Sequence, residues 1–145
     1  MKISTKGQYA LQMMLDLAVN DTGEYITIKS IAKRQNLSEK YLEQIVNMLS
    51  RAGMVKSIRG SKGGYRLAGA ASQYTVGDIL RTIEGSLAPV DMSEAPWEQI
   101  TPMEECLRDK VWSRLNEAID GVLDDVTLED LRKQYQSSVG YDYVI

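Results

Sequence analysis

The stretch LSEKYLEQIVNMLSRAGMVKSIRGSKGGYRL, residues 37–67, predicts a helix followed by a two-stranded hairpin. Ser38 has a hydroxyl that can cap the first turn, and the apolar residues that follow recur with the 3.6-residue period of a helix. These apolar residues are Tyr41, Leu42, Ile45, Val46, Met48 and Leu49. Arg51 complements the helix dipole at the carboxyl end, and Gly53 supplies the left-handed residue that commonly follows a helix.

A basic, glycine-rich turn lies inside the predicted hairpin. One strand is expected to contain Met54, Val55 and Ile58, and the returning strand Tyr65 and Leu67. The turn between them is Arg59, Gly60, Ser61, Lys62, Gly63 and Gly64, and its three glycines allow positive φ. A helix followed by a basic-tipped hairpin is typical of the recognition helix and wing of a winged-helix DNA-binding domain. The alternative is an ordinary helix and hairpin, but a solvated turn of that kind does not require two cations.

Two shorter helices are predicted before this recognition helix. Ser4 or Thr5 is expected to cap the first helix, and Thr27 is expected to cap a second helix over residues 28–35. The segment 25–27 has the character of a short strand that pairs with the hairpin. The second helix and the longer recognition helix, joined by a short turn, form a helix-turn-helix.

The formal net charge of −3 by itself argues against a nucleic-acid binder, but the charge is divided unevenly along the chain. Residues 1–66 hold 11 lysines and arginines against 5 aspartates and glutamates, a net charge of +6. Residues 67–145 hold 6 against 15, a net charge of −9. The sequence therefore predicts a basic part that meets phosphate and an acidic part that avoids it.

The rest of the chain sets the expected domain boundaries. Thr75 caps a predicted helix over residues 76–84, and Thr127 caps a short helix that reaches about Gln136. We expect a winged helix-turn-helix domain at 1–85, an irregular loop at 86–101, the dimerisation helix and the short helix at 102–136, and a tail at 137–145. The predicted fold class is mainly α with a small β-hairpin.

The dimerisation helix carries a continuous apolar stripe. Thr101 is its cap and Pro102 its first residue, and the pattern continues to about Leu123. The stripe consists of Met103, Leu107, Val111, Leu115, Ala118, Ile119 and Val122. It is longer than a domain of this size can cover, so we expect a second copy to pack on it in a homodimer. The alternative is that the stripe packs wholly on its own domain.

The composition argues against an enzyme, a metal site and a membrane protein. The chain has one cysteine and no histidine, which leaves no internal disulfide and no imidazole for catalysis or metal binding. No nucleophile–base pair or phosphate loop is present, so we expect no catalytic residue, no metal and no cofactor. The start MKISTKGQYA lacks the apolar core of a signal peptide, and no apolar run is long enough to span a bilayer. We therefore expect a cytoplasmic protein.

Five segments together resemble the Rrf-two family of bacterial winged-helix regulators. They are MKISTKGQYAL, SEKYLEQIVNML, GMVKSIRGSKGGYRL, YTVGDILRTIEG and VTLEDL, and they span nearly the whole chain. The resemblance implies an amino-terminal winged helix followed by a long helix that crosses its twofold mate.

The winged-helix interpretation predicts which residues contact double-stranded DNA. The expected major-groove residues are Ser38, Lys40, Tyr41, Glu43, Gln44 and Asn47, and the expected wing residues are Arg59, Gly60, Ser61 and Lys62. The expected phosphate contacts are Lys2, Lys6, Lys56 and Arg66. Gln44 is suited to adenine, Glu43 to cytosine and Lys40 to guanine or phosphate. Arg59 is suited to a narrow minor groove, whereas Tyr41 fits the core as well as a phosphate contact.

These residues predict sequence-specific DNA binding by a homodimer, and the family resemblance implies a transcriptional regulator that acts as a repressor. For each charged residue taken alone, a solvated position is at least as good an explanation, so the prediction depends on the cluster. The alternative from another class is an adaptor whose winged helix binds a partner protein instead of DNA.

Some members of the family bind an iron–sulfur cluster through three cysteines in the loop before the long helix. Here Cys106 matches the last of the three, and residues 88–103 contain no cysteine, so we expect no cluster. Cys106 is then either a packing residue or a redox-sensing thiol.

The chain resembles the cluster-free branch of the family, whose members repress sulfur-assimilation genes and work with the enzyme cysteine synthase. The segment SLAPVDM and the Tyr-x-Ile ending favour this branch. The resemblance implies that the tail residues Tyr143, Val144 and Ile145 bind that enzyme and place Ile145 in its active site, where backbone N–H groups can hold the carboxylate. The alternative is that the tail folds back onto its own dimer.

Overall fold

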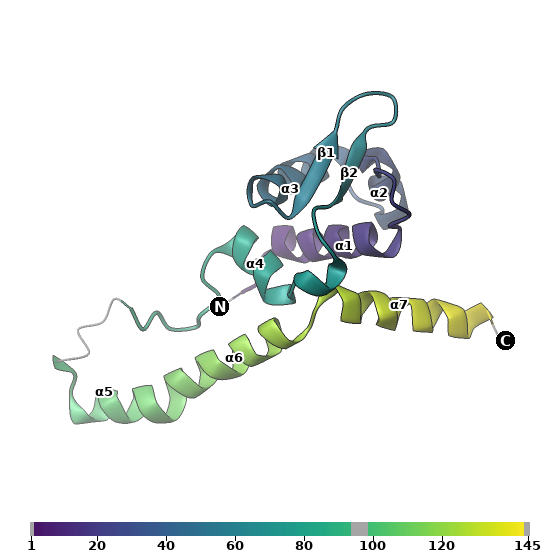
Figure 1. The fold of residues 1–145 in the computed structure, drawn as a ribbon. Coiled ribbons are helices and arrows are strands. Elements are labelled where there is room, and N and C mark those ends of the chain that lie inside the picture. The colour runs from purple at the N-terminus through teal and green to yellow at the C-terminus, as the bar shows by residue number, and fades with distance from the viewer. Residues whose placement is uncertain (1, 94–98, 144–145) are drawn as a thin grey trace.

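The computed structural model describes residues 2–93 and 99–143, and its first half is a winged helix (Figure 1). The elements in order are α1 (Thr5–Val19), α2 (Ile28–Gln35), α3 (Glu39–Arg51), β1 (Val55–Ile58) and β2 (Gly64–Leu67). The hydroxyls of Ser4, Thr27 and Ser38 accept hydrogen bonds from the first turns of the three helices, as predicted.

The two strands pair antiparallel, with Val55 opposite Leu67 and Ser57 opposite Tyr65. Ile26 forms an isolated antiparallel bridge to Tyr65, which confirms the expected pairing of residues 25–27 with the hairpin. A side chain at position 64 would place Cβ 2.4 Å from the carbonyl oxygen of Ile26, so the close packing requires glycine there.

The glycines of the turn serve two purposes. Gly60 and Gly64 have φ of 111° and 150°, in the region that favours glycine. The expectation of positive φ is wrong for Gly63, which lies outside that region. A Cβ at Gly63 would lie 2.4 Å from the carbonyl oxygen of Ile58, so this glycine allows the chain to approach itself.

One hydrophobic core holds the winged helix together, and α1 lies at its centre, in contact with α3, α4 (Val76–Glu84), β2 and the last helix. The side chains with almost no exposed area are Met13, Met14, Leu17, Ile31, Leu42, Ile45, Val46, Leu49, Ile79 and Leu128. The methionine-rich face of α1 is therefore packing, as its helical spacing predicted.

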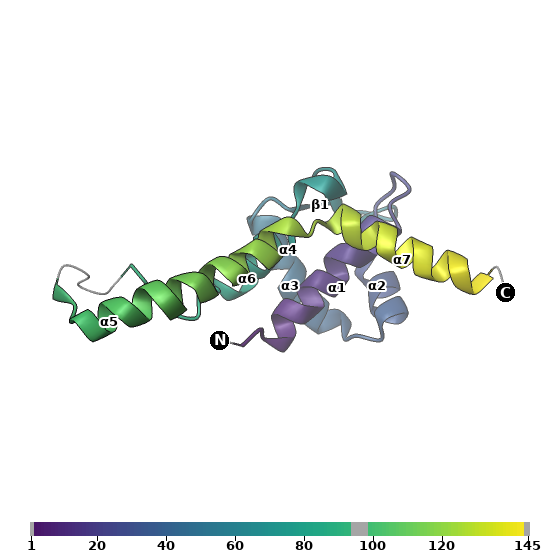
Figure 2. The ribbon, with the colours of Figure 1, turned by 90° about the horizontal axis from the view of Figure 1, so that it is seen from below.

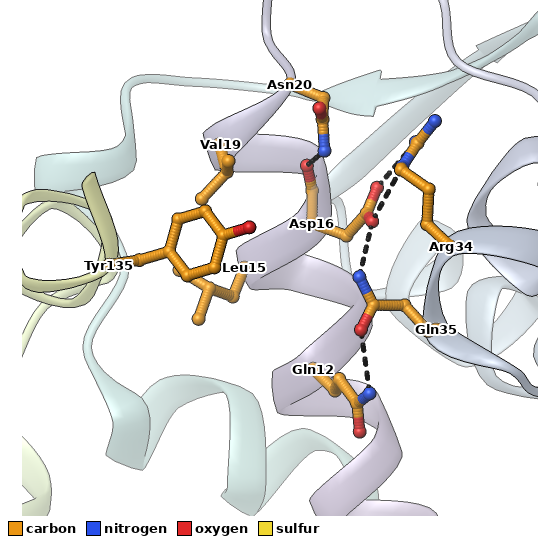
Figure 3. A pocket seen from close by; sticks show the side chains of 8 residues that line it. All are labelled: Gln12, Leu15, Asp16, Val19, Asn20, Arg34, Gln35 and Tyr135. Atoms are coloured by element: carbon orange, nitrogen blue, oxygen red, sulfur yellow. Dashed lines mark hydrogen bonds and ion pairs between the residues drawn. The ribbon is translucent and has the colours of Figure 1, made fainter. Parts of the chain in front are cut away.

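A polar network fixes α2 against α1 (Figure 3). The buried carboxylate of Asp16 accepts hydrogen bonds from Nε and Nη2 of Arg34 at 3.0 and 2.8 Å. Gln35 donates to the same carboxylate at 2.7 Å and accepts from Gln12 at 2.8 Å. The hydrogen bond to Asp16 is the main cause that raises the pKa of the Arg34 guanidinium above its ordinary value. Because α2 and α3 form the helix-turn-helix, this network orients that unit on α1.

The second half of the chain is a long helical rod followed by a last helix. The rod consists of α5 (Pro102–Leu107), a π-helical turn (Arg108–Trp112) and α6 (Ser113–Asp125). It begins at the capping box of Thr101 and ends two residues after the predicted Leu123. In Figure 2 the rod and α7 (Leu128–Tyr143) leave the body in opposite directions.

The last helix is longer than predicted, because α7 continues past Gln136 to Tyr143. The serines and Gly140 in this part have low helix propensity and interrupt the apolar pattern. In the structure the hydroxyl of Ser138 donates to the carbonyl of Gln134 at 3.0 Å, so the helix satisfies this side chain internally. The predicted tail residues Val144 and Ile145 lie outside the described residues.

The rod joins the body at α4 through three kinds of contact. Leu80, Leu87 and Leu123 form a second apolar cluster. Arg81 donates to Asp120 at 2.9 Å and to Asp124 at 2.6 Å. The hydrogen bond from Arg81 to Asp124 is the main cause that lowers the pKa of the Asp124 carboxyl. A bridge between Thr75 and Thr127 lies beside them. These contacts fix the direction of the rod relative to the winged helix.

Candidate nucleic-acid interface

Helix α3 has one buried face and one polar face. Leu42, Ile45, Val46 and Leu49 are buried in the core. Among the predicted major-groove residues, Ser38, Lys40, Glu43, Gln44 and Asn47 are exposed. The structure therefore brings four of the six predicted residues to the free side of one helix and leaves Ser38 exposed at its start as the N-cap, which is the arrangement that a groove-binding helix requires.

Tyr41 is the exception on α3, because it is half-buried. Its ring packs edge-on against Tyr9 of α1, with centroids 5.7 Å apart and planes at 85°. Contacts of this kind stabilise a core. Tyr41 therefore packs against the core, and its partly exposed side chain is still accessible to DNA.

The hairpin turn projects from the body beyond α2 and α3 (Figure 1). Arg59, Gly60, Ser61 and Lys62 are all exposed there, and Lys56 is exposed on β1. Within residues 2–93 and 99–143, neither Arg59 nor Lys62 forms an ion pair or a side-chain hydrogen bond. Two cations at the tip are thus available to an external anion.

Arg66 differs from the other predicted phosphate contacts. Its Nη1 donates to the carbonyl oxygen of Gly23 at 2.7 Å, and its guanidinium lies 5.6 Å from the ring centre of Tyr25. The side chain therefore fastens β2 to the loop before α2. Lys2 and Lys6 belong to the amino-terminal end, which lies beside the end of α4, where the backbone N–H of Ser4 donates to Glu84 at 3.0 Å. The hairpin turn lies on the opposite side of the body (Figure 1).

The predicted dimerisation stripe is largely uncovered in one chain. Met103 is 76% exposed, Leu107 44%, Val111 40%, Leu115 40% and Val122 66%. Ala118 is exposed as well, whereas Ile119 packs against the Leu80 cluster. An apolar stripe of this extent is unusual on the surface of an isolated chain.

The rod and the rest of the described residues contain few side chains placed to bind a metal ion. Cys106 is exposed on α5, and the part of the chain that the structure describes contains no group of three His, Cys, Asp or Glu side chains placed to hold a metal. No helix among those residues combines the length and apolar character that a membrane span needs.

The comparisons with known proteins agree with this architecture. The regulator CymR of Bacillus subtilis is 47% identical over 131 residues, covering 90% of this chain and 89% of CymR. Its solved structure, that of the "Global Cysteine Regulator of B. subtilis", superposes with a TM-score of 0.78 and 44% identity, covering 92% of this chain and 98% of the other. The structure of T. potens IscR superposes with a TM-score of 0.74 and 42% identity, covering 95% and 90%.

The Rrf2 family, described as an iron-dependent transcriptional regulator, matches residues 3–134. The residues of this chain do not fit a cluster held by three cysteines, because Cys106 is the only cysteine and histidine is absent. The family match covers most of the chain, and the relatives are named as transcriptional regulators rather than enzymes. The chain belongs to the Rrf2 family of transcriptional regulators.

Proposed function

We propose that this protein is a homodimeric repressor that binds specific DNA sequences, with α3 in the major groove and the hairpin turn in the adjacent minor groove. The observation that carries the proposal is the position of exposed polar and cationic side chains on α3 and the hairpin, opposite the buried apolar face of α3. Cations without internal partners are the groups that bind phosphate and base edges.

The proposed division of labour among the side chains follows their chemistry. Gln44 and Glu43 stand near the exposed start of α3, where an amide pairs with adenine and a carboxylate accepts from cytosine. Arg59 enters the minor groove. Lys62 and Lys56 bind phosphate beside it, and Lys2 and Lys6 bind phosphate at the other end of the domain.

Dimerisation is proposed to bury the stripe on the rod. A second copy of α5 and α6 presents the same apolar side chains, so the two rods cover each other across a twofold axis. DNA recognition then uses two half-sites, because each protomer carries one α3 and one hairpin.

We infer that the regulated genes belong to cysteine and sulfur metabolism. The support is the 47% identity to CymR of Bacillus subtilis, which is described as a global cysteine regulator. Deletion of the gene is expected to raise transcription of genes for sulfur assimilation, which RNA sequencing measures. Unchanged transcription of those genes would assign the regulator to other targets.

The proposed DNA binding is tested by capturing genomic fragments on the purified full-length protein. We expect one enriched palindromic sequence, bound at least a hundredfold more tightly than random duplex, with affinity that falls steeply as salt rises. Binding that is weak, unselective and independent of salt would instead support the adaptor of partner proteins.

The partner proposed for the carboxyl-terminal end is cysteine synthase, bound through Tyr143, Val144 and Ile145. Helix α7 extends away from the body as far as Tyr143 (Figure 1), and an apolar side chain can fill a pocket of the enzyme. Calorimetric titration should show that removing Ile145 abolishes binding and that the substrate O-acetylserine competes with the tail. Equal affinity with and without Ile145 would exclude this mode of binding.

A further inference from the structure

A pocket of about 260 Å³ opens between α3 and the hairpin. Its walls are Asn47, Ser50, Ser57, Ile58, Arg59, Gly64 and Tyr65. Asn47 and Ser50 are three residues apart on α3, so they lie on the same side of the helix. Ser50 and Ser57 are absent from the DNA contacts that the sequence predicted.

The pocket begins where the core ends. Val55 and Leu67 are opposite each other in the hairpin, and both are buried. Ser57 and Tyr65 form the pair two residues further out, and they share the face of Val55 and Leu67 because side chains alternate along a strand. The apolar face of the hairpin therefore continues outward as a polar surface beside α3.

The polar side chains of this pocket are free to bind an external acceptor. Within the described residues, no hydrogen bond or ion pair involves the side chains of Asn47, Ser50, Ser57 or Arg59. Two hydroxyls, an amide and a guanidinium can all donate, and no carboxylate lines the pocket. The walls thus suit an anion with several acceptor oxygens.

The geometry of DNA identifies that anion. Adjacent major and minor grooves are separated by a single sugar–phosphate backbone, so a protein that places a helix in one and a hairpin in the other must admit this backbone between them. We propose that the pocket is a seat for one phosphodiester of that backbone, held by Ser50 and Ser57. The inference rests on the proposed DNA binding and adds the contact that links the two groove-binding elements.

The seat has two consequences for recognition. Ile58, which is 51% exposed at the edge of the pocket, can pack against the deoxyribose beside the phosphate. The serine hydroxyls carry no charge, so they add affinity without displacing a cation from the DNA. A phosphate fixed here sets the register of α3 relative to the hairpin, and it carries no sequence information itself.

The test uses the full-length protein and the operator recovered by genomic capture, measured by fluorescence anisotropy. We expect Ser50→Ala and Ser57→Ala each to weaken binding about threefold to tenfold, equally on operator and random duplex, with the salt slope unchanged. Ser137→Ala, at an exposed position of α7, is the matched control and should bind as wild type does. Equal thermal melting temperatures will show that the serine variants are folded.

A second measurement locates the phosphate. Methylphosphonates placed one at a time along each half-site should reveal a position whose neutralisation weakens the wild type but has much less effect on the Ser50→Ala, Ser57→Ala double variant. The proposed phosphate site would be wrong if both serine variants bound DNA with wild-type affinity. It would also be wrong if each methylphosphonate reduced the affinity of the wild type and of the double variant equally. DNA binding itself would stand in either case. Failure of the wild type to bind any duplex would overturn the proposed function together with the seat.

Discussion

The winged-helix body and the rod bury their apolar side chains to very different extents. In the body, Met13, Leu42 and Ile45 have no exposed area. In the rod, Leu123 is buried, while Met103 and Val122 remain 76% and 66% exposed. Both regions contain amphipathic helices, so the difference lies in whether the same chain supplies a surface that covers the apolar face.

This contrast indicates two sources of stability. The body encloses its core by packing α1 against five neighbouring elements, and its stability should not depend on protein concentration. The rod has contacts with α4 at one end and an open stripe along the rest, so we expect its order to depend on a partner and hence on protein concentration.

Leu115→Asp should convert the dimer into monomers. Burial of a leucine side chain contributes about 2 kcal/mol, and a twofold interface loses it twice, so the dissociation constant should rise about a thousandfold. Sedimentation velocity measures the change, and Lys110→Asp, off the stripe on the same rod, should remain dimeric. A dimer that survives both Leu115→Asp and Val111→Asp would remove the rod as the interface.

Arg34→Ala should destabilise the body by about 3 kcal/mol, because it leaves the buried Asp16 carboxylate without its cation while Gln35 remains bound. Urea unfolding followed by circular dichroism measures the free energy of unfolding, best in the Leu115→Asp monomer, where dimerisation does not contribute. Lys33→Ala, at the exposed neighbouring position, should change it by less than about 0.5 kcal/mol. Similar losses in both variants would show that the ion pair has no special role.

The boundaries of the winged helix could be predicted because local chemistry determines them. Ser38, Thr27 and Thr75 cap their helices through bonds within a single turn, and the apolar spacing of α3 selects its buried face. The Asp16 network could not be predicted, because its residues lie 18 and 19 positions apart and meet only through the packing of α1 on α2. The serines of the phosphate seat were missed for the same reason, since Ser50 and Ser57 face one pocket from two elements.

The candidate DNA contacts also include some that the sequence could predict and some that depend on packing between elements. Exposure of Gln44 and Arg59 follows from their positions on a helix and in a turn. The engagement of Arg66 with Gly23 and Tyr25 depends on a loop that folds against β2, which residue spacing does not reveal. The long α7 was missed because helix propensity is weak beyond Gln136, whereas bonds within the helix hold it in the structure.

Arg59→Ala should weaken operator binding by about 1–3 kcal/mol and relax the preference at the base pairs under the hairpin. Lys62→Ala should instead weaken all duplexes about equally and reduce the salt slope by about one unit. Lys133→Ala, an exposed cation of α7, is the control with no expected change. If both hairpin variants match the wild type on operator and random duplex, the hairpin does not contact DNA.

The smallest expected effect concerns the start of the rod, where Cys106 is the single cysteine of the chain. One exposed thiol on α5 cannot supply the several thiolates that an iron–sulfur cluster needs. Anaerobic reconstitution with iron and sulfide should therefore leave no visible charge-transfer absorption after desalting, and Cys106→Ala should bind the operator as the wild type does. Retention of stoichiometric iron and sulfide by the wild type, and their loss in Cys106→Ala, would mean that the rod acquires further ligands on dimerisation. It would also place the metal at the interface that Leu115→Asp disrupts, so the same reconstitution of that monomer would then decide whether both protomers are required.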